Sequence, residues 1–284
     1  MQQNEKNVHW FPGHMKKAAI RIEEQVKLVD FIIILLDSRI PISSKSELLE
    51  KIAGNKKKLY VLTKVDLSDD EMTKKWLEKF NNNGDRAIGL DLTSNASKKE
   101  LVKVCGEFAS DKKEKYLKKG IKNIGCRAMV LGIPNVGKST LINLFASKHL
   151  AETGNIPGVT KNITWVKVGN FELMDVPGIL EPNYKDKNKA INLALIGSMK
   201  ESILPTHDLC ISCVNFLLAY YKKEFIERYG LDATRLDYEF IINEIAKKRG
   251  YLSKGDILDT NKCELNLLNE FRNGKITKFT LERI

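Results

Sequence analysis

The chain has 284 residues, of which 43% are hydrophobic and 29% are charged. This balance excludes a wholly disordered chain, and at roughly 150 residues per domain the length allows about two domains. Lys and Arg outnumber Asp and Glu by 47 to 36, a formal net charge of +11, which favours a polyanionic partner, either nucleic acid or an anionic membrane.

Strand-like and helical patterns alternate in the first part of the chain. Residues 15–29 show apolar side chains at helical spacing. Strand-like runs, rich in the aliphatic residues of strands buried on both faces, lie at 31–37, 59–63, 87–92 and 127–131, and helical patterns lie at 46–52, 70–80, 98–108 and 138–149. Runs at 163–168 and 171–174 are expected to pair as a hairpin. The alternation predicts a doubly wound, mostly parallel α/β sheet.

The pattern changes after residue 182. Helical patterns follow at 187–203, 208–229, 236–249 and 265–272, and strand-like runs almost vanish. The polar stretch 181–188 has the composition of a linker. We therefore expect an α/β domain over residues 1–183 and an all-α C-terminal domain over residues 184–284.

The segment Gly132-Ile-Pro-Asn-Val-Gly-Lys-Ser139 matches the P-loop pattern G-x-x-x-x-G-K-[ST], between a predicted strand and a predicted helix. Its glycines allow backbone N–H groups to surround a phosphate at a helix N-terminus. We expect Lys138 to reach the β- and γ-phosphates and the Ser139 hydroxyl to ligate Mg²⁺. The predicted phosphate-binding residues are Asn135, Val136, Gly137, Lys138, Ser139 and Thr140.

A second motif, Asp175-Val-Pro-Gly178, has the D-x-x-G form and lies about 40 residues beyond the P-loop. We expect Asp175 to hold Mg²⁺ and the Gly178 amide to meet the γ-phosphate. Between the two motifs, Thr160 is a candidate switch residue that closes on Mg²⁺ when the γ-phosphate is present. Thr153 and Thr164 compete with Thr160 for this role.

A base-recognition loop is predicted at Thr63-Lys64-Val65-Asp66, which closes a strand and precedes a helix. The Asp66 carboxylate can accept hydrogen bonds from N1–H and the 2-amino group of guanine, whereas adenine would leave it unpaired. Lys64 can cover the base with its aliphatic stem. The loop with Thr93 and Ser94 could offer a backbone N–H to the guanine carbonyl. The expected ligand is therefore GTP or GDP.

The base loop precedes the P-loop by about 70 residues, whereas in ordinary GTPases it follows the P-loop. With this order the chain resembles the circularly permuted GTPases, and most closely the ribosome biogenesis GTPase A family. The resemblance covers nearly the whole chain, with few motifs beyond about residue 180. Besides the three nucleotide motifs, it rests on residues 10–15, 37–41, 157–160, 165–169, 228–230 and 247–250.

The resemblance implies GTP hydrolysis that assists maturation of the large ribosomal subunit. GTP would promote docking on a pre-ribosomal particle, and hydrolysis stimulated by that particle would release the protein. Ile179 stands where Ras-like proteins have the Gln that orients the attacking water, and the resemblance assigns this role to His14, with His9 as its neighbour and competitor. It also suggests that Asn135 holds K⁺. Because Thr63 replaces the usual Asn, we expect a weaker supporting hydrogen bond to the P-loop or base.

The expected partner is a large-subunit precursor, with rRNA phosphates meeting the basic residues, because such contacts depend on charge more than on sequence. Clusters of basic residues lie at 56–58, 112–119, 222–223 and 247–249. A small-subunit factor is an alternative, although neither an OB-fold nor a zinc knuckle is evident. A second alternative is an RNA-binding scaffold in which the nucleotide is only a structural ligand, which Ile179 would allow.

We expect a cytoplasmic monomer without membrane contact. The longest aliphatic run, at 31–36, is far shorter than the roughly 20 residues that cross a bilayer, and no apolar secretory signal begins the chain. The five cysteines are odd in number and scattered, so a disulfide framework is not expected. Cys210 and Cys213 form a C-x-x-C pair that we interpret as part of a buried helix, because no second pair completes a zinc site.

Overall fold

A six-stranded sheet forms the centre of the computed structural model, which describes residues 8–9, 13–118, 125–145, 163–168, 171–184, 186–199 and 204–284. The sheet order is β4-β3-β2-β5-β7-β6, and only β6, on the edge, is antiparallel to its neighbour. Every side chain of β2 is buried, as expected of a central strand covered on both faces. All six predicted strands are confirmed: β2 (Phe31–Asp37), β3 (Lys57–Thr63), β4 (Arg86–Leu90), β5 (Cys126–Gly132), β6 (Thr164–Val168) and β7 (Phe171–Asp175).

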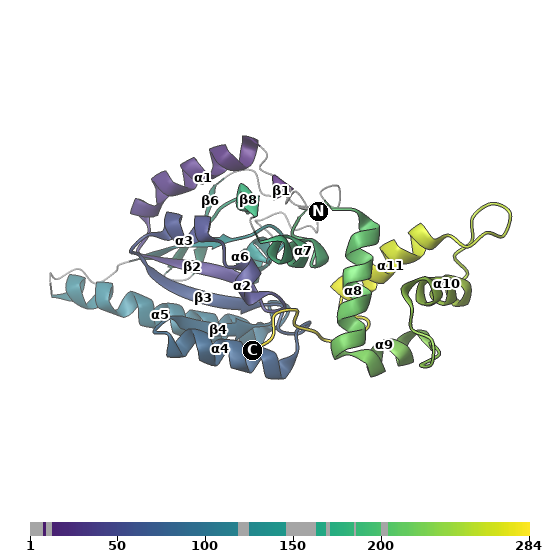
Figure 1. Cartoon of the computed structure of the whole chain (residues 1–284). Coiled ribbons are helices and arrows are strands. Elements are labelled where there is room, and N and C mark those ends of the chain that lie inside the picture. The colour runs from purple at the N-terminus through teal and green to yellow at the C-terminus, as the bar shows by residue number, and fades with distance from the viewer. Residues whose placement is uncertain are drawn as a thin grey trace.

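Helices cover both faces of this sheet. In Figure 1, α1 and α3 lie on one side of the strands and α5 lies on the other. Side-chain caps fix two of the helix starts, because the Ser46 hydroxyl accepts from Leu49 N and the Asp69 carboxylate accepts from two amides of α4. The helices are α1 (Gly13–Gln25), α2 (Pro41–Ser44), α3 (Glu47–Ala53), α4 (Asp70–Asn82), α5 (Asn95–Leu117) and α6 (Lys138–Phe145).

Within the described residues, five helices follow the sheet. They are α7 (Lys187–Leu195), α8 (Thr206–Tyr220), α9 (Lys222–Tyr229), α10 (Tyr238–Arg249) and α11 (Thr260–Arg272). The single helix predicted over 208–229 is wrong, because the backbone leaves the helical conformation at Tyr221, with φ −137° and ψ 37°. The predicted helix over 187–203 ends at Leu195, shortly before Gly197 with φ 77°. Both α5 and α11 are longer than predicted.

Several contacts cross the predicted boundary between residues 183 and 184. The short strand β8 (Asn183–Tyr184) pairs antiparallel with β1 (Val8–His9), and α7 contacts α2. After α11 the chain runs back to the sheet, so that the C-terminus lies beside α4 (Figure 1). There the Trp76 indole donates to the carbonyl of Glu282. The division of the chain into two domains at this point stays a prediction.

None of the helices in the described part of the chain combines the length and the apolar composition that a membrane span requires. The prediction that Cys210 and Cys213 lie in a buried helix is confirmed, because both are buried in α8.

Candidate functional site

The predicted nucleotide loops all follow the carboxyl ends of parallel strands. The base loop follows β3, the loop with Thr93 follows β4, the P-loop follows β5 and the D-x-x-G segment follows β7. Because these four strands run in the same direction within one sheet, their carboxyl ends meet at one edge, where ligands bind in open α/β sheets.

Thr63 joins the base loop directly to the P-loop. Its fully buried hydroxyl lies 2.7 Å from the carbonyl oxygen of Val136 and donates a hydrogen bond to it, and it lies 3.1 Å from the carbonyl oxygen of Leu36. Thr63 therefore makes a supporting hydrogen bond to the P-loop, and the expectation that this support is weaker than that of the usual Asn stays a prediction. The threonine hydroxyl is long enough to reach the P-loop backbone by itself.

The next residue, Lys64, is held in an unusual conformation. Its backbone φ of 57° is rare for a residue other than glycine. Its Nζ forms an ion pair with Oδ2 of Asp37 at a distance of 3.1 Å. Burial lowers the pKa of Lys64, and the charge of Asp37 opposes that shift. Asp37, the last residue of β2, is fully buried. The base loop is thus tied to the strand beside it.

Asp66 is exposed at the end of the base loop, where its carboxylate can meet a ligand. Partial burial raises the pKa of Asp66, and the negative charge of Asp91 raises it further. Asp91 itself orders the neighbouring loop, because its carboxylate accepts hydrogen bonds from both the amide and the hydroxyl of Thr93. Ser94, the next residue, is half-buried.

The loop after β4 also touches the P-loop. A Cβ atom built on Gly137 would lie 2.9 Å from Cδ1 of Leu92, which is closer than real Cβ contacts allow. Gly137 has a φ of 105°, and Asn135 has a φ of 59°. The P-loop therefore adopts the left-handed conformations that turn successive N–H groups inward, and both the base loop and the loop after β4 contact it.

Lys138, at the start of α6, is almost completely buried. Its Nζ donates to the carbonyl oxygens of Gly132 and Ile133, at 3.1 Å and 2.8 Å. Burial lowers the pKa of Lys138 to about 8, and the Asp175 carboxylate opposes the shift. Ser139 and Thr140 follow in the first turn of the same helix, half-buried and exposed respectively.

Gly178 lies against both Lys138 and the P-loop backbone. A Cβ atom added to Gly178 would be 2.7 Å from Nζ of Lys138 and 2.8 Å from Cα of Pro134. Only glycine fits at this distance. The structure therefore brings the D-x-x-G segment to the lysine that the sequence predicts to contact phosphate.

Asp175 provides a test of the predicted Mg²⁺ site. The residue is 1% exposed, and its Oδ1 has no hydrogen-bond partner among the described residues. Burial raises the pKa of Asp175, and Lys138 lowers it. A buried carboxylate oxygen without a partner is costly unless a cation binds it. The buried carboxylate of Asp175 therefore fits a cation such as Mg²⁺.

Two predicted site residues are not tested by these contacts. Thr160 and its competitor Thr153 lie outside the described residues, and Thr164 lies in β6. His14 is the second residue of α1, but its side chain is outside the described part. Ile179 is fully buried, so an aliphatic side chain packed in the core occupies the position of the water-orienting Gln.

Sequence reasoning missed the supports of the P-loop. Asn135 donates from Nδ2 to the carbonyl oxygen of Gly197 at 2.8 Å, and the Ser198 hydroxyl donates to the carbonyl oxygen of Pro134 at 2.9 Å. These contacts join residues more than 60 positions apart in the chain. Gly197 and Ser198, which follow α7, belong to no sequence motif by which this support could be recognised.

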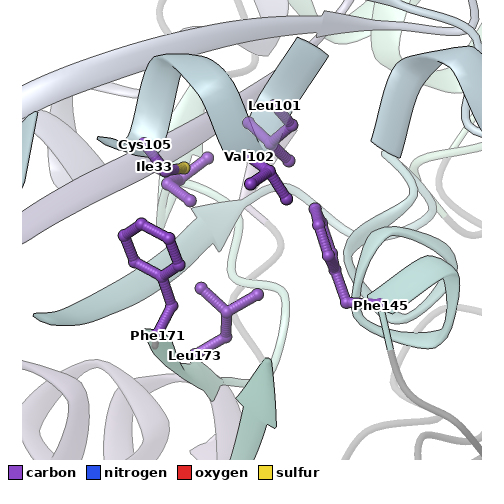
Figure 2. Close-up of a pocket in the computed structure, with 7 residues that line it drawn as sticks. All are labelled: Ile33, Leu101, Val102, Cys105, Phe145, Phe171 and Leu173. Atoms are coloured by element: carbon purple, nitrogen blue, oxygen red, sulfur yellow. The ribbon is translucent and has the colours of Figure 1, made fainter. Parts of the chain in front are cut away.

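An apolar depression elsewhere on the sheet is not part of this site. Figure 2 shows its side chains, which come from α5, α6 and the two strands β2 and β7 and carry no hydrogen-bonding groups suited to a phosphate or a base. They are Ile33, Leu101, Val102, Cys105, Phe145, Phe171 and Leu173.

The joined loops define a class of protein. A P-loop, a D-x-x-G segment and a guanine-type base loop meet at one edge of a doubly wound sheet, and the base loop comes first in the chain. This combination defines a circularly permuted GTPase.

Comparisons with known proteins agree with this class. Residues 127–245 match a family described as 50S ribosome-binding GTPases. The chain is 40% identical to a ribosome biogenesis GTPase A of Bacillus cereus, over 97% of this chain and 93% of that protein. It is 30% identical to the Thermotoga maritima protein of the same name, over 96% of this chain and 94% of that protein.

Two solved structures of YlqF are also similar. The GDP-bound form of TM YlqF shares 26% identity with a TM-score of 0.65, over 93% of this chain and 98% of that one. The GNP-bound form from T. maritima shares 25% identity with the same TM-score, over 94% and 98%. The chain belongs to the ribosome biogenesis GTPase A family, and it is a GTPase that takes part in ribosome assembly.

Proposed function

We propose that this GTPase assists maturation of the large ribosomal subunit. In the GTP state it binds a pre-ribosomal particle, and hydrolysis stimulated by that particle releases it. The names of the relatives and the description of the matching family support the ribosomal partner. For the nucleotide, the supporting observation is the hydrogen bond from Thr63 to Val136, because it places the base loop and the P-loop side by side.

The proposed roles follow from the contacts at the sheet edge. Asp66 accepts hydrogen bonds from the guanine edge, with Thr93 and Ser94 beside it. Lys138 exchanges two backbone carbonyls for phosphate oxygens, which costs little reorganisation because its ammonium already lies within the P-loop. The Gly178 amide meets the γ-phosphate. Mg²⁺, held by Asp175, Ser139 and Thr160, would neutralise charge on the phosphate oxygens.

His14 is proposed to orient the attacking water. The pairing of β1 with β8 supports this role, because it places the N-terminal arm beside the chain that follows the D-x-x-G segment. Ile179 is buried and aliphatic and cannot take the role. We also propose that the side-chain oxygen of Asn135 binds K⁺, and the hydrogen bond from Nδ2 to Gly197 would fix the orientation of that amide.

We propose that the protein acts as a cytoplasmic monomer and that residues 184–284 contact rRNA. The formal charge of +11 supports an rRNA partner, because phosphate contacts depend on the number of basic side chains. Binding to the particle should therefore weaken steeply as the salt concentration rises.

Single-turnover GTP hydrolysis, measured alone and with purified large or small ribosomal subunits, tests the proposal. We expect stimulation by large subunits and not by small ones, and we expect His14→Ala to lower the stimulated rate while the affinity for GDP stays unchanged. Stimulation by small subunits would favour a small-subunit factor. No stimulation by either would favour a scaffold that uses the nucleotide as a structural ligand.

A further inference from the structure

Lys64 of the base loop forms a cluster with two buried charged residues, Asp37 and Arg39. The Asp37 carboxylate accepts hydrogen bonds from Nε and Nη2 of Arg39, at 2.9 Å and 2.8 Å, and forms the ion pair with Lys64. Although burial raises the pKa of Asp37, the charges of Arg39 and Lys64 outweigh this and hold it well below its usual value. The carboxylate is therefore ionised, and it connects Arg39 to the base loop.

Arg39 also reaches the end of α11. The residue is 1% exposed, and its Nη1 donates to the carbonyl oxygen of Arg272 at 2.7 Å. Its guanidinium lies over the ring of Phe279, 5.6 Å from the ring centroid, and its carbonyl oxygen accepts from the amide of Leu281. The guanidinium and the backbone carbonyl of Arg39 are therefore both held by residues of the C-terminal part of the chain.

Residues 273–284, here called the C-terminal tail, contact the base loop directly as well. The amide of Phe279 donates to the carbonyl oxygen of Leu67 at 3.1 Å, one residue beyond Asp66. Phe279 is fully buried and stacks on Phe271 of α11 with ring centroids 3.9 Å apart. The tail is therefore anchored in the helical part of the chain and bonded to the loop that carries Asp66.

We propose that Arg39 is a positioning residue for guanine recognition and that the C-terminal tail holds Arg39 and the base loop in the conformation that binds guanine. Arg39 touches no part of the nucleotide and acts through Asp37, Lys64 and the loop backbone. Nucleotide binding and docking of the tail are then thermodynamically linked, so each must strengthen the other by the same factor. The inference depends on the assignment of Asp66 to the base in the proposed function.

The variant Arg39→Lys tests the first part. Lysine keeps the charge beside Asp37, but it lacks the planar fork that bonds Asp37 and the Arg272 carbonyl together. We expect the Kd for GDP to rise about fivefold or more. The Kd for inosine diphosphate, which lacks the 2-amino group, should rise less. The ratio of the Kd for inosine diphosphate to the Kd for GDP should therefore fall. Arg235→Lys, which alters an exposed ion pair with Asp237, is the matched control and should change neither value.

An equal rise in both Kd values, or no rise in either, would show that Arg39 has no role in positioning the base loop. Failure of the base assignment has a different signature. If Asp66 does not bind the base, Asp66→Asn retains its preference for guanine nucleotides. If only the role of Arg39 fails, Asp66→Asn loses that preference, and Arg39→Lys leaves the ratio of the Kd for inosine diphosphate to the Kd for GDP unchanged.

The tail is tested by a second pair of variants and by hydrogen exchange in the unaltered protein. Phe279→Leu should lower the ratio of the two Kd values, whereas Phe225→Leu, at an equally buried position in α9, should lower only the stability. GDP should slow exchange of the amides of Phe279 and Leu281 more than exchange of the amides of α10. Equal slowing in both places, or none in the tail, overturns the linkage even if the variants fail to fold.

Discussion

At the scale of single residues, guanine selectivity is expected to depend on the charge of Asp66. Asp66→Asn replaces one acceptor oxygen with an amide donor, which matches the 2-carbonyl of xanthine and opposes the 2-amino group of guanine. We expect the affinity for GDP to fall by about 100-fold, since charged hydrogen bonds contribute about 1.5–3 kcal/mol each, and the affinity for xanthosine diphosphate to rise. Competition binding with both nucleotides measures this.

Asp85→Asn is a suitable control for that substitution. Asp85 precedes β4, at the opposite edge of the sheet from Asp66, and it forms a long ion pair with Lys45 at 3.9 Å. Asp85→Asn should leave the affinities for GDP and for xanthosine diphosphate unchanged. Retained selectivity for guanine in Asp66→Asn would place base recognition elsewhere.

The close approach of Gly178 gives a second prediction at this scale. In Gly178→Ala the new methyl group would overlap Nζ of Lys138 and the backbone of Pro134, so the D-x-x-G segment must move away from the P-loop. We expect at least a tenfold loss of affinity for a non-hydrolysable GTP analogue, about 1.4 kcal/mol, and a smaller loss for GDP, which lacks the γ-phosphate. Isothermal titration with both nucleotides separates the two effects.

The matched control for Gly178 is Gly106→Ala. Gly106 lies in α5 with no atom within 4 Å of an added Cβ. Alanine there should raise the free energy of unfolding by up to about 1 kcal/mol, because glycine is a poor helix former, and nucleotide binding should not change. If Gly178→Ala bound both nucleotides normally, the contact of Gly178 with the γ-phosphate would be excluded.

At the scale of elements, the strands were predictable and the helix ends were not. The apolar run 31–36 in β2 is a compositional signal that burial on both faces requires, and the predicted bounds of β2 match the observed ones. Tyr221 breaks a predicted helix because of tertiary contacts, since its hydroxyl donates to Asp69, 152 positions earlier in the chain. No local pattern contains that information.

The same distinction applies to the site. Its loops were predictable because each has a short local motif, whereas the residues that support the loops come from distant parts of the chain. The contact between Arg39 and Arg272 joins positions 233 residues apart. The local sign of this cluster was the segment 37–41, which contains both Asp37 and Arg39 and carries part of the family resemblance.

The turn after α7 can be tested as a support of the P-loop. Ser198→Ala removes the buried hydrogen bond to the Pro134 carbonyl and should lower the free energy of unfolding by about 1–3 kcal/mol, because a buried acceptor loses its partner. We also expect weaker GDP binding. Ser212→Ala, whose exposed hydroxyl donates to the carbonyl oxygen of Asp208 in its own helix, is the control for denaturant unfolding. A loss no larger than in the control would exclude this support.

At the scale of the whole molecule, the permuted order gives the γ-phosphate a short path to the helices. The chain passes from Gly178 through β8 into α7, and the turn after α7 returns to the P-loop through Gly197 and Ser198. The C-terminal end of α7 is in turn bonded to α11, because Arg272 donates to the carbonyls of Ala194 and Leu195. A displacement of Gly178 therefore acts on an element that is bonded to both the P-loop and the helical part.

We predict that α8–α11 change their orientation relative to the sheet between the GDP state and the GTP state. All five native cysteines are buried, so spin labels can be attached selectively to cysteines introduced at exposed lysines. Labels at Lys103 of α5 and Lys247 of α10 should show a distance change of about 2 Å or more when GDP is replaced by a non-hydrolysable GTP analogue. Labels at Lys103 and Lys74, both beside the sheet, should show none. Identical distance distributions in the two states for the first pair would mean that the γ-phosphate acts only within the nucleotide site, and that the path through α7 does not move the helices.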